Sequence, residues 1–146
     1  PPTPAQLAVR ERFREAAAYA KSALADPERR ALYEPAAQKA TQPIFATVVA
    51  DYLKPPTVMI VDLTGYQGQV GDPIRIVAVD DVEVTAVNVA IRAEDLTVLE
   101  EGAAVFQNGS WVYTATTLRT AGEPVTITAT AVDRPGHTGT MTESWS

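Results

Sequence analysis

The sequence predicts a mainly β protein in which a helical N-terminal segment precedes an antiparallel β-sandwich. Residues 125–133 alternate apolar and polar side chains and then meet the turn sequence Pro135-Gly136, which is typical of a half-buried strand entering a hairpin. Residues 74–80 and 84–92 show the same alternation. By contrast, residues 3–25 are rich in Ala, Leu, Arg, Glu and Lys, which favour helix. We therefore expect about seven strands preceded by two or three α-helices.

The composition excludes several classes of protein. With 146 residues, of which 46% are hydrophobic, the chain is long enough to bury a core. It contains no cysteine, which excludes disulfides, cysteine zinc sites and thiol catalysis. No apolar run approaches the roughly 20 residues that a membrane helix needs, so we expect no membrane insertion. The composition favours no particular cellular compartment.

The charges are unevenly distributed along the chain. Residues 1–55 carry 8 basic and 6 acidic side chains, whereas residues 56–146 carry 4 basic and 12 acidic ones. An acidic surface repels the phosphate backbone of nucleic acids. In the first part, arginines at positions 10, 12 and 14 interleave with Glu11 and Glu15, as on a solvated helix face. We therefore expect no nucleic-acid partner.

The first helix is expected to begin at Thr3 and Pro4. Thr3 is suited to the N-cap position, and Pro4 to the first helical position, where no amide hydrogen is needed. Apolar residues then recur at helical spacing on one stripe: Val9, Phe13, Ala16, Ala17, Ala20 and Leu24. Because an Ala-rich helix gains its stability mostly from packing, we expect this stripe, including Phe13, to be buried against a neighbour.

Two further helices are expected before residue 57. Asp26-Pro27-Glu28 predicts a second start, with Asp26 as N-cap, and Pro35 should limit or kink that helix. A third helix is expected over residues 43–53, with its apolar side formed by Ile44, Phe45, Val48, Val49 and Tyr52. Lys54-Pro55-Pro56 should end it in an extended link. The expected division is a helical segment at 1–56 and a sandwich at 57–146.

The strands are read from the alternation of side chains and from the turn residues between them. The expected strands are residues 58–63, 74–80, 84–92, 96–100, 104–106, 111–116 and 125–132, with 138–145 as an eighth if 104–106 is counted separately. Asn108-Gly109 is a strong hairpin signal, because both central positions of a type I′ turn need positive φ.

The same alternation assigns residues to the two faces of the strands. The core-facing set is expected to contain Ile74, Ile76, Ala78, Val87, Val89, Ile91, Trp111, Tyr113, Val125, Ile127, Ala129 and Ala131. Thr126, Thr128 and Thr130 then lie on an open face. A slip of one residue would invert both faces, so the register should be firm.

Four stretches of this region carry a family resemblance. They are residues 71–76 (GDPIRI), 79–84 (VDDVEV), 87–91 (VNVAI) and 129–137 (ATAVDRPGH). They resemble bacterial immunoglobulin-like domains, the fibronectin-III-like and cadherin-like modules of bacterial proteins. Such modules often read A-T-D-x-x-G-N-x at the last stretch, where this chain has A-V-D-R-P-G-H-T. The resemblance covers residues 57–146 and implies an immunoglobulin-like sandwich, whereas the helical segment has no counterpart in such modules.

Three aspartates are the candidates for a metal site. Asp80, Asp81 and Asp133 lie in turns that share one end of a sandwich of this type, and together they could bind Ca²⁺. The alternative is that aspartate ends strands because its side chain caps turns. No Asp-x-Asp-x-Asp-Gly loop is present, so we expect no metal site.

Four aromatic residues are candidates for a sugar-stacking platform. Trp111 and Tyr113 share a face, and we expect them in the core. Tyr66 lies in a predicted loop and Trp145 close to the end of the chain, so these two are the expected exposed aromatics.

No residue pattern favours catalysis. The single histidine, His137, lies in a turn; the serines lack a nucleophile elbow, and the glycines of residues 65–71 are not followed by a phosphate-binding Lys-Ser/Thr pair. We expect no enzyme and no cofactor. The leading expectation is a non-catalytic structural or protein-interaction module that binds a protein partner or self-associates. The alternative is a carbohydrate-binding accessory module.

Overall fold

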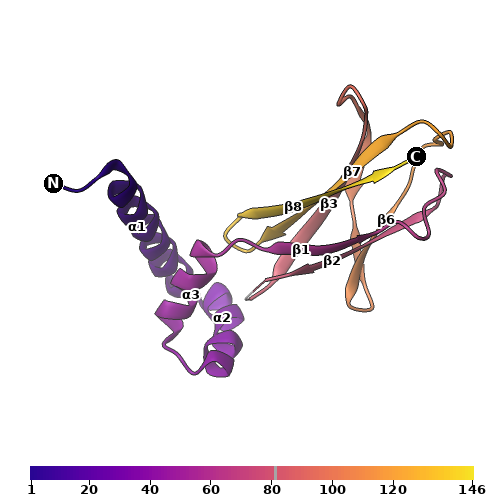
Figure 1. The fold of residues 1–146 in the computed structure, drawn as a ribbon. Coiled ribbons are helices and arrows are strands. Elements are labelled where there is room, and N and C mark those ends of the chain that lie inside the picture. Colours follow the sequence, from indigo (N-terminus) through magenta and orange to yellow (C-terminus); the bar gives the residue numbers. More distant parts are fainter. Residues whose placement is uncertain (81) are drawn as a thin grey trace. The chain divides into compact units, whose positions relative to one another are not determined.

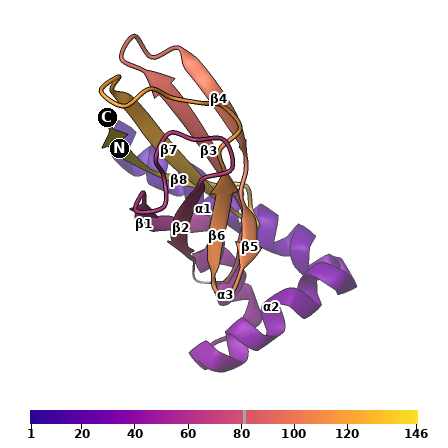
Figure 2. The same cartoon turned by 90° about the vertical axis from the view of Figure 1, so that its right-hand side faces the viewer.

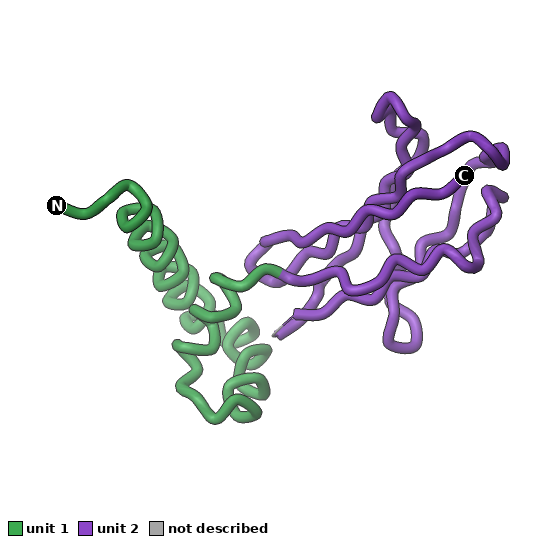
Figure 3. The backbone as a smooth tube through the Cα atoms, in the orientation of Figure 1, with its two compact units in different colours: residues 1–55 green, residues 56–146 purple. Residues whose placement is uncertain are grey.

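The computed structural model describes residues 1–80 and 82–146. The chain divides into two compact units, residues 1–55 and 56–146 (Figure 3). The first unit contains three α-helices and the second contains eight strands in two antiparallel sheets, which confirms the expected β-sandwich preceded by helices. No helix in the described part of the chain is both long and apolar enough to cross a bilayer.

The helices of the first unit are α1 (Pro4–Ala25), α2 (Pro27–Ala40) and α3 (Ile44–Leu53) (Figure 1). Thr3 caps α1 as expected: its side chain accepts from the Gln6 amide, and the Gln6 side chain accepts from the Thr3 amide. Asp26 caps α2 by accepting from the Glu28 amide at 3.0 Å. These caps occupy backbone groups that the first turn of a helix leaves without partners.

The expected burial of Phe13 is wrong, because its side chain is 55% exposed. The buried residues of α1 are Ala16, Ala20 and Ala23 in its C-terminal half. Helix α1 has 22 residues and α3, which packs on it, has 10, so α3 covers less than half of its length. The end of α3 contacts the N-terminal half of α1 through Arg12, which donates to the Leu53 carbonyl oxygen at 3.3 Å, but it does not cover Phe13.

Pro35 does not end α2, which was the first of the two effects expected of it. The helix continues through Pro35 to Ala40, with Tyr33 and Ala37 buried on either side. Pro35 itself is exposed. Water can therefore satisfy the carbonyl that loses its amide donor, while the two buried neighbours hold the helix together.

The second unit consists of two four-stranded sheets. In one sheet the order is β1 (Thr57–Asp62), β2 (Pro73–Val79), β6 (Ser110–Thr114) and β5 (Val105–Gln107). In the other it is β4 (Val98–Ala103), β3 (Val84–Ala93), β7 (Val125–Asp133) and β8 (Thr138–Trp145) (Figures 1 and 2). The chain passes from one sheet to the other between β2 and β3, between β4 and β5, and between β6 and β7.

The core of the second unit lies between the inner faces of the two sheets, as the alternation predicts. In the register of β3 with β7, Val87 pairs with Ala131, Val89 with Ala129 and Ile91 with Ile127, and all six side chains are buried. Ile74 and Ile76 of β2 are also fully buried and pair with Tyr113 and Trp111 of β6.

Two turns test the local reading of the sequence. Asn108 and Gly109 have φ values of 50° and 84°, as the expected hairpin turn requires. Leu96, in contrast, was expected at the start of a strand, but it has a φ of 71° and the strand begins at Val98. Asp95 accounts for the difference, because its side chain accepts from the Thr97 amide and closes a turn there.

Candidate interaction surface

The outer face of the sheet β1-β2-β6-β5 is aliphatic. Ile60, Val79 and Val105 are 50%, 49% and 59% exposed, and Val77 and Val112 beside them are half-buried. The register places Ile60 opposite Val77 and Val105 opposite Val112, and the exposed Arg75, which is the β2 partner of Val112, lies on the same face. We call the five aliphatic residues the aliphatic face.

The outer face of the other sheet is polar and serves as an internal comparison. Its central and last strands carry hydroxyl side chains on the side opposite to the core: Thr126, Thr128, Thr130, Thr140, Thr142 and Ser144. Thr128 and Thr142 are hydrogen-bonded to each other across the strands at 2.9 Å. This is the usual pattern of an antiparallel sheet with one face in water, so the aliphatic face is the exception.

The aliphatic face has a sequence signal that the alternation rule passes over. Strand β2 reads PIRIVAV: Ile74 and Ile76 point inward, and on the outside Arg75 is followed by the apolar Val77 and Val79. A strand that is apolar on both faces over its second half is expected to have that half covered on both sides. Contiguous exposed apolar patches often mark interaction sites.

A groove lies at the border of this sheet, where the inner face reaches solvent. The Phe106 ring is 58% exposed and lies 5.3 Å from the Trp111 ring, with the two planes tilted by 58°. Ala78, Val82 and Val84 add apolar walls, and the groove encloses about 450 Å³. Its polar lining comes from Asp80, Glu83 and Thr85.

The strands around this groove are free of charge over a long stretch. No charged residue lies between Glu101 and Arg119, a segment that contains β5, the hairpin turn and β6. The unit as a whole carries 12 acidic and 4 basic side chains. The hairpin is therefore a neutral surface on an acidic body.

Of the two aromatics expected on the surface, Tyr66 is buried, so that expectation is wrong. Its side chain is 1% exposed, and the half-buried Trp145 ring packs edge-on against it at 4.9 Å. The loop folds inward because Gly68, with φ at +77°, lies directly against Arg119 and Trp145. Tyr113 is 3% exposed, as expected for a core residue, and Trp111 is half-buried. The four candidates form no shared platform.

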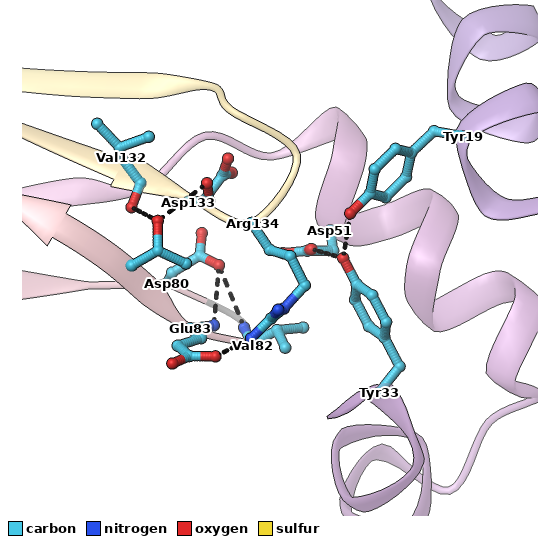
Figure 4. A network of polar contacts seen from close by, with 10 residues as sticks. Tyr19, Tyr33, Asp51, Asp80, Val82, Glu83, Val132, Asp133 and Arg134 are labelled. Atoms are coloured by element: carbon cyan, nitrogen blue, oxygen red, sulfur yellow. Dashed lines mark hydrogen bonds and ion pairs between the residues drawn. The ribbon is translucent and has the colours of Figure 1, made fainter. Parts of the chain in front are cut away.

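The structure brings two of the three candidate metal ligands together. Asp80 and Asp133 offer carboxylate oxygens within 4.8 Å of each other, and Asp81 lies outside the described residues. Both also serve their own turns. Asp80 accepts from the Val82 and Glu83 amides (Figure 4). Asp133 accepts from the His137 amide at 2.8 Å. Burial, together with the charge of Asp80, raises the pKa of Asp133.

A buried carboxylate that the sequence reasoning missed lies in β4. Glu100 is 7% exposed, and its Oε2 accepts from the Tyr113 hydroxyl at 2.6 Å and from the Thr116 amide and hydroxyl at 2.8 and 2.9 Å. Its Oε1 accepts from the Thr117 hydroxyl at 2.7 Å, which in turn accepts from Arg119. Burial alone would raise the pKa of Glu100, but these hydrogen bonds outweigh it and hold the pKa below its ordinary value.

The Tyr113 hydroxyl shows the reciprocal effect. Burial and the hydrogen bond to Glu100 raise the pKa of Tyr113 to about 12. The hydroxyl therefore stays protonated and donates to the carboxylate. The contact joins β4 of one sheet to β6 of the other, which is a structural role.

The helical unit has a polar network of its own. The Tyr33 hydroxyl donates to Asp51 at 2.6 Å and lies 2.9 Å from the Tyr19 hydroxyl (Figure 4). Burial, followed by the hydrogen bond to Asp51, raises the pKa of Tyr33. The Arg29 guanidinium of α2 lies 5.2 Å from the centre of the Tyr19 ring of α1. Together, the contacts among Tyr19, Tyr33 and Asp51 link the three helices of this unit.

Comparisons with known proteins add two structural neighbours. No protein-family model matches the chain, and no curated protein matches it. The crystal structure of an engineered protein is similar over 69% of this chain and 26% of that chain, with 22% identity and a TM-score of 0.45. A conjugative transposon lipoprotein from Bacteroides eggerthii is similar over 62% of this chain and 94% of its own, with 11% identity and a TM-score of 0.34. At these TM-scores, the strand order and register of this chain, rather than either neighbour, define its fold.

Proposed function

We propose that the chain is a non-catalytic protein-interaction module that binds a partner protein through the aliphatic face. The single observation that carries the proposal is the contrast between its two outer sheet faces, one aliphatic and one hydroxyl-rich. Both sheets belong to the same sandwich, so solvent alone would favour polar side chains on both. Covering by a protein surface accounts for the aliphatic one.

The fold within this proposal is an immunoglobulin-like one. The orders β1-β2-β6-β5 and β4-β3-β7-β8 correspond to strands A-B-E-D and C′-C-F-G of immunoglobulin domains. This correspondence supports the family resemblance of residues 57–146. Modules of this architecture serve many functions, so the surface, and not the fold, supports the interaction role.

The buried carboxylates support a non-catalytic role. Glu100 is saturated by donors from its own unit, and its lowered pKa makes it a poor proton donor or acceptor near neutral pH. Asp133 has a raised pKa, but one of its oxygens is occupied by the His137 amide in the last hairpin.

Photo-crosslinking tests the interaction role. A photoreactive amino acid is placed at Ile60 on the aliphatic face or, as a matched control, at Thr142 on the opposite face, in cells that express the protein. We expect a discrete protein adduct from position 60 that Val79→Lys abolishes, and none from position 142. Equal adducts from both positions, or none from position 60, would contradict the proposal.

A second candidate function is carbohydrate binding, which the Phe106–Trp111 pair favours. Two neighbouring aromatic rings beside Asp80, Glu83 and Thr85 offer stacking and hydrogen bonding in one groove. The test is a fluorescence and calorimetric titration with soluble cello-, xylo- and chito-oligosaccharides. Binding that Phe106→Ala weakens at least about tenfold would support this function, and no heat and no change in tryptophan emission would exclude these sugars.

A further inference from the structure

The free edge of β5 differs from the other three outer strands of the sandwich. Strands β1 and β8 pack beside each other, and Gly139 allows this because a Cβ there would collide with the Pro56 carbonyl oxygen. Strand β4 carries Glu101 on its surface and Glu100 pointing inward, and its register shifts against β3. Charges, inward-pointing acids and bulges are the usual protection of an edge against added strands.

Strand β5 carries no charge, inward-pointing acid or bulge in the described structure, and its one protection is its length of three residues. It reads Val-Phe-Gln, all three residues are exposed, and it lies within the uncharged segment between Glu101 and Arg119. It forms the border of its sheet next to β6 (Figure 2). An uncharged edge of this kind is a template for strand pairing, which at this length involves few backbone hydrogen bonds.

The hairpin geometry determines which backbone groups face outward. Gln107 and Ser110 flank the two-residue turn, and Val105 pairs with Val112. In an antiparallel ladder, pairs that exchange hydrogen bonds alternate with pairs that do not. The Phe106–Trp111 pair is of the second kind, so the N–H and C=O of Phe106 point away from β6 and toward the open edge.

We infer that β5 pairs in antiparallel fashion with β5 of a second copy of this chain, about a twofold axis through Phe106. Phe106 then exchanges two backbone hydrogen bonds with its symmetry mate, and Val105 faces Gln107 of the other copy. The short strand is thus complementary to itself, as a twofold contact requires.

The distribution of charge favours contact between two copies at the β5 edge over contact at the other edges of the sandwich. Each sandwich has 12 acidic and 4 basic residues, so two copies repel each other over most of their surfaces. Within the β5–β6 hairpin itself no like charges meet, and the acids beside it are Asp80 and Glu83 of the groove. Pairing also extends the aliphatic face from one copy into the next, so the inference rests on the proposed interaction function and enlarges its surface.

Sedimentation equilibrium of the purified full chain, from micromolar to millimolar concentration, tests this inference. We expect a reversible dimer whose dissociation constant rises at least about tenfold in Val105→Lys and in Phe106→Pro. On the backbone, proline at 106 removes an outward-facing N–H and no β5–β6 hydrogen bond, so the ladder can remain, although the ring that packs on Trp111 is lost as well. The matched control Ile60→Lys lies on the opposite edge strand and should leave the constant within about twofold.

Amide hydrogen exchange provides a second readout. The Phe106 amide should become more protected as the concentration of the wild-type chain rises, and the Ile60 amide should not. A chain that stays monomeric at millimolar concentration, a dimer unaffected by Val105→Lys, or one lost equally in Ile60→Lys would overturn the inference. None of these results alters the crosslinking expected from a partner protein, so the two proposals fail separately.

Discussion

Glu100 is a buried carboxylate whose recorded partners are all donors. Four hydrogen bonds from three residues converge on its two oxygens. Glutamine has nearly the same shape, but its NH₂ group is a donor and would replace one of the two oxygens that accept hydrogen bonds here. The site therefore favours glutamate because both positions need an acceptor, and not because of the size of the side chain.

Glu100→Gln should therefore lower the free energy of unfolding by about 2–3 kcal/mol at pH 7. Urea unfolding followed by tryptophan fluorescence measures this. The neighbouring Glu101→Gln, on an exposed side chain, should cost less than about 0.5 kcal/mol.

Because the pKa of Glu100 is lowered in the fold, its stabilising effect is present above the ordinary glutamate pKa and is lost as the pH falls below that range. The difference between wild type and Glu100→Gln should accordingly narrow in acid; a difference independent of pH would contradict this account.

The pKa shift of Asp133 has the opposite direction to that of Glu100. Its pKa is raised in the fold, so between the ordinary aspartate pKa and the raised one the native state binds more protons than the unfolded state. Its contribution to stability therefore falls as the pH rises through that interval. Asparagine keeps the oxygen that accepts from the His137 amide and removes the charge.

Asp133→Asn should thus increase the free energy of unfolding at pH 7, with the gain disappearing as the pH falls to the ordinary aspartate range. Thermal unfolding from pH 4 to 8 measures it, with Glu143→Gln on an exposed side chain as control. A loss of stability at pH 7 would show that the charge of Asp133 is favourable in the fold.

At the scale of elements, the loop between β1 and β2 shows how one glycine can close a core. Gly68 and Gly71 both have positive φ, at +77° and +93°. A Cβ on Gly68 would lie 2.7 Å from the Arg119 carbonyl oxygen and 2.8 Å from the Trp145 ring, whereas one on Gly71 would meet nothing within 4 Å. A side chain at either position would therefore strain the backbone, but only a side chain at position 68 would also collide with its neighbours.

Gly71→Ala should cost about 1–2 kcal/mol from its left-handed backbone alone. Gly68→Ala should cost about 1–3 kcal/mol more, because Trp145 and Arg119 must shift. Chemical denaturation gives both values, and the emission of Trp145 should move to longer wavelength only in Gly68→Ala. Equal costs for the two variants would mean that the loop moves aside freely.

At the scale of the whole molecule, the sandwich has its own hydrophobic core. The buried cluster between its sheets is formed entirely by side chains of residues 58–131, within the second unit. A unit of this size with a continuous core is in the range of independently folding domains.

A fragment of residues 56–146 should therefore fold and unfold cooperatively without the helices. Circular dichroism should show a β spectrum with one thermal transition, and the exchange-protected amides should lie in β3 and β7, which carry the most buried residues. A fragment without near-ultraviolet signal or protected amides would contradict the independence of this core.

The sequence by itself determined the order of helices and strands and the inner face of most strands. The reason is that caps, turn residues and period-two alternation act over a few residues: Thr3, Asp26, Asn108-Gly109 and the run at 125–133 each act locally. Tertiary structure decided the rest. The packing of α3 on α1 buried Ala16, Ala20 and Ala23 but not Phe13. Gly68 folded Tyr66 inward, and donors from β6 and the residues after it turned Glu100 into a core residue. The aliphatic face and the free edge of β5 depend on which strands are neighbours, and pairing between strands distant in the sequence is a property that no local pattern contains.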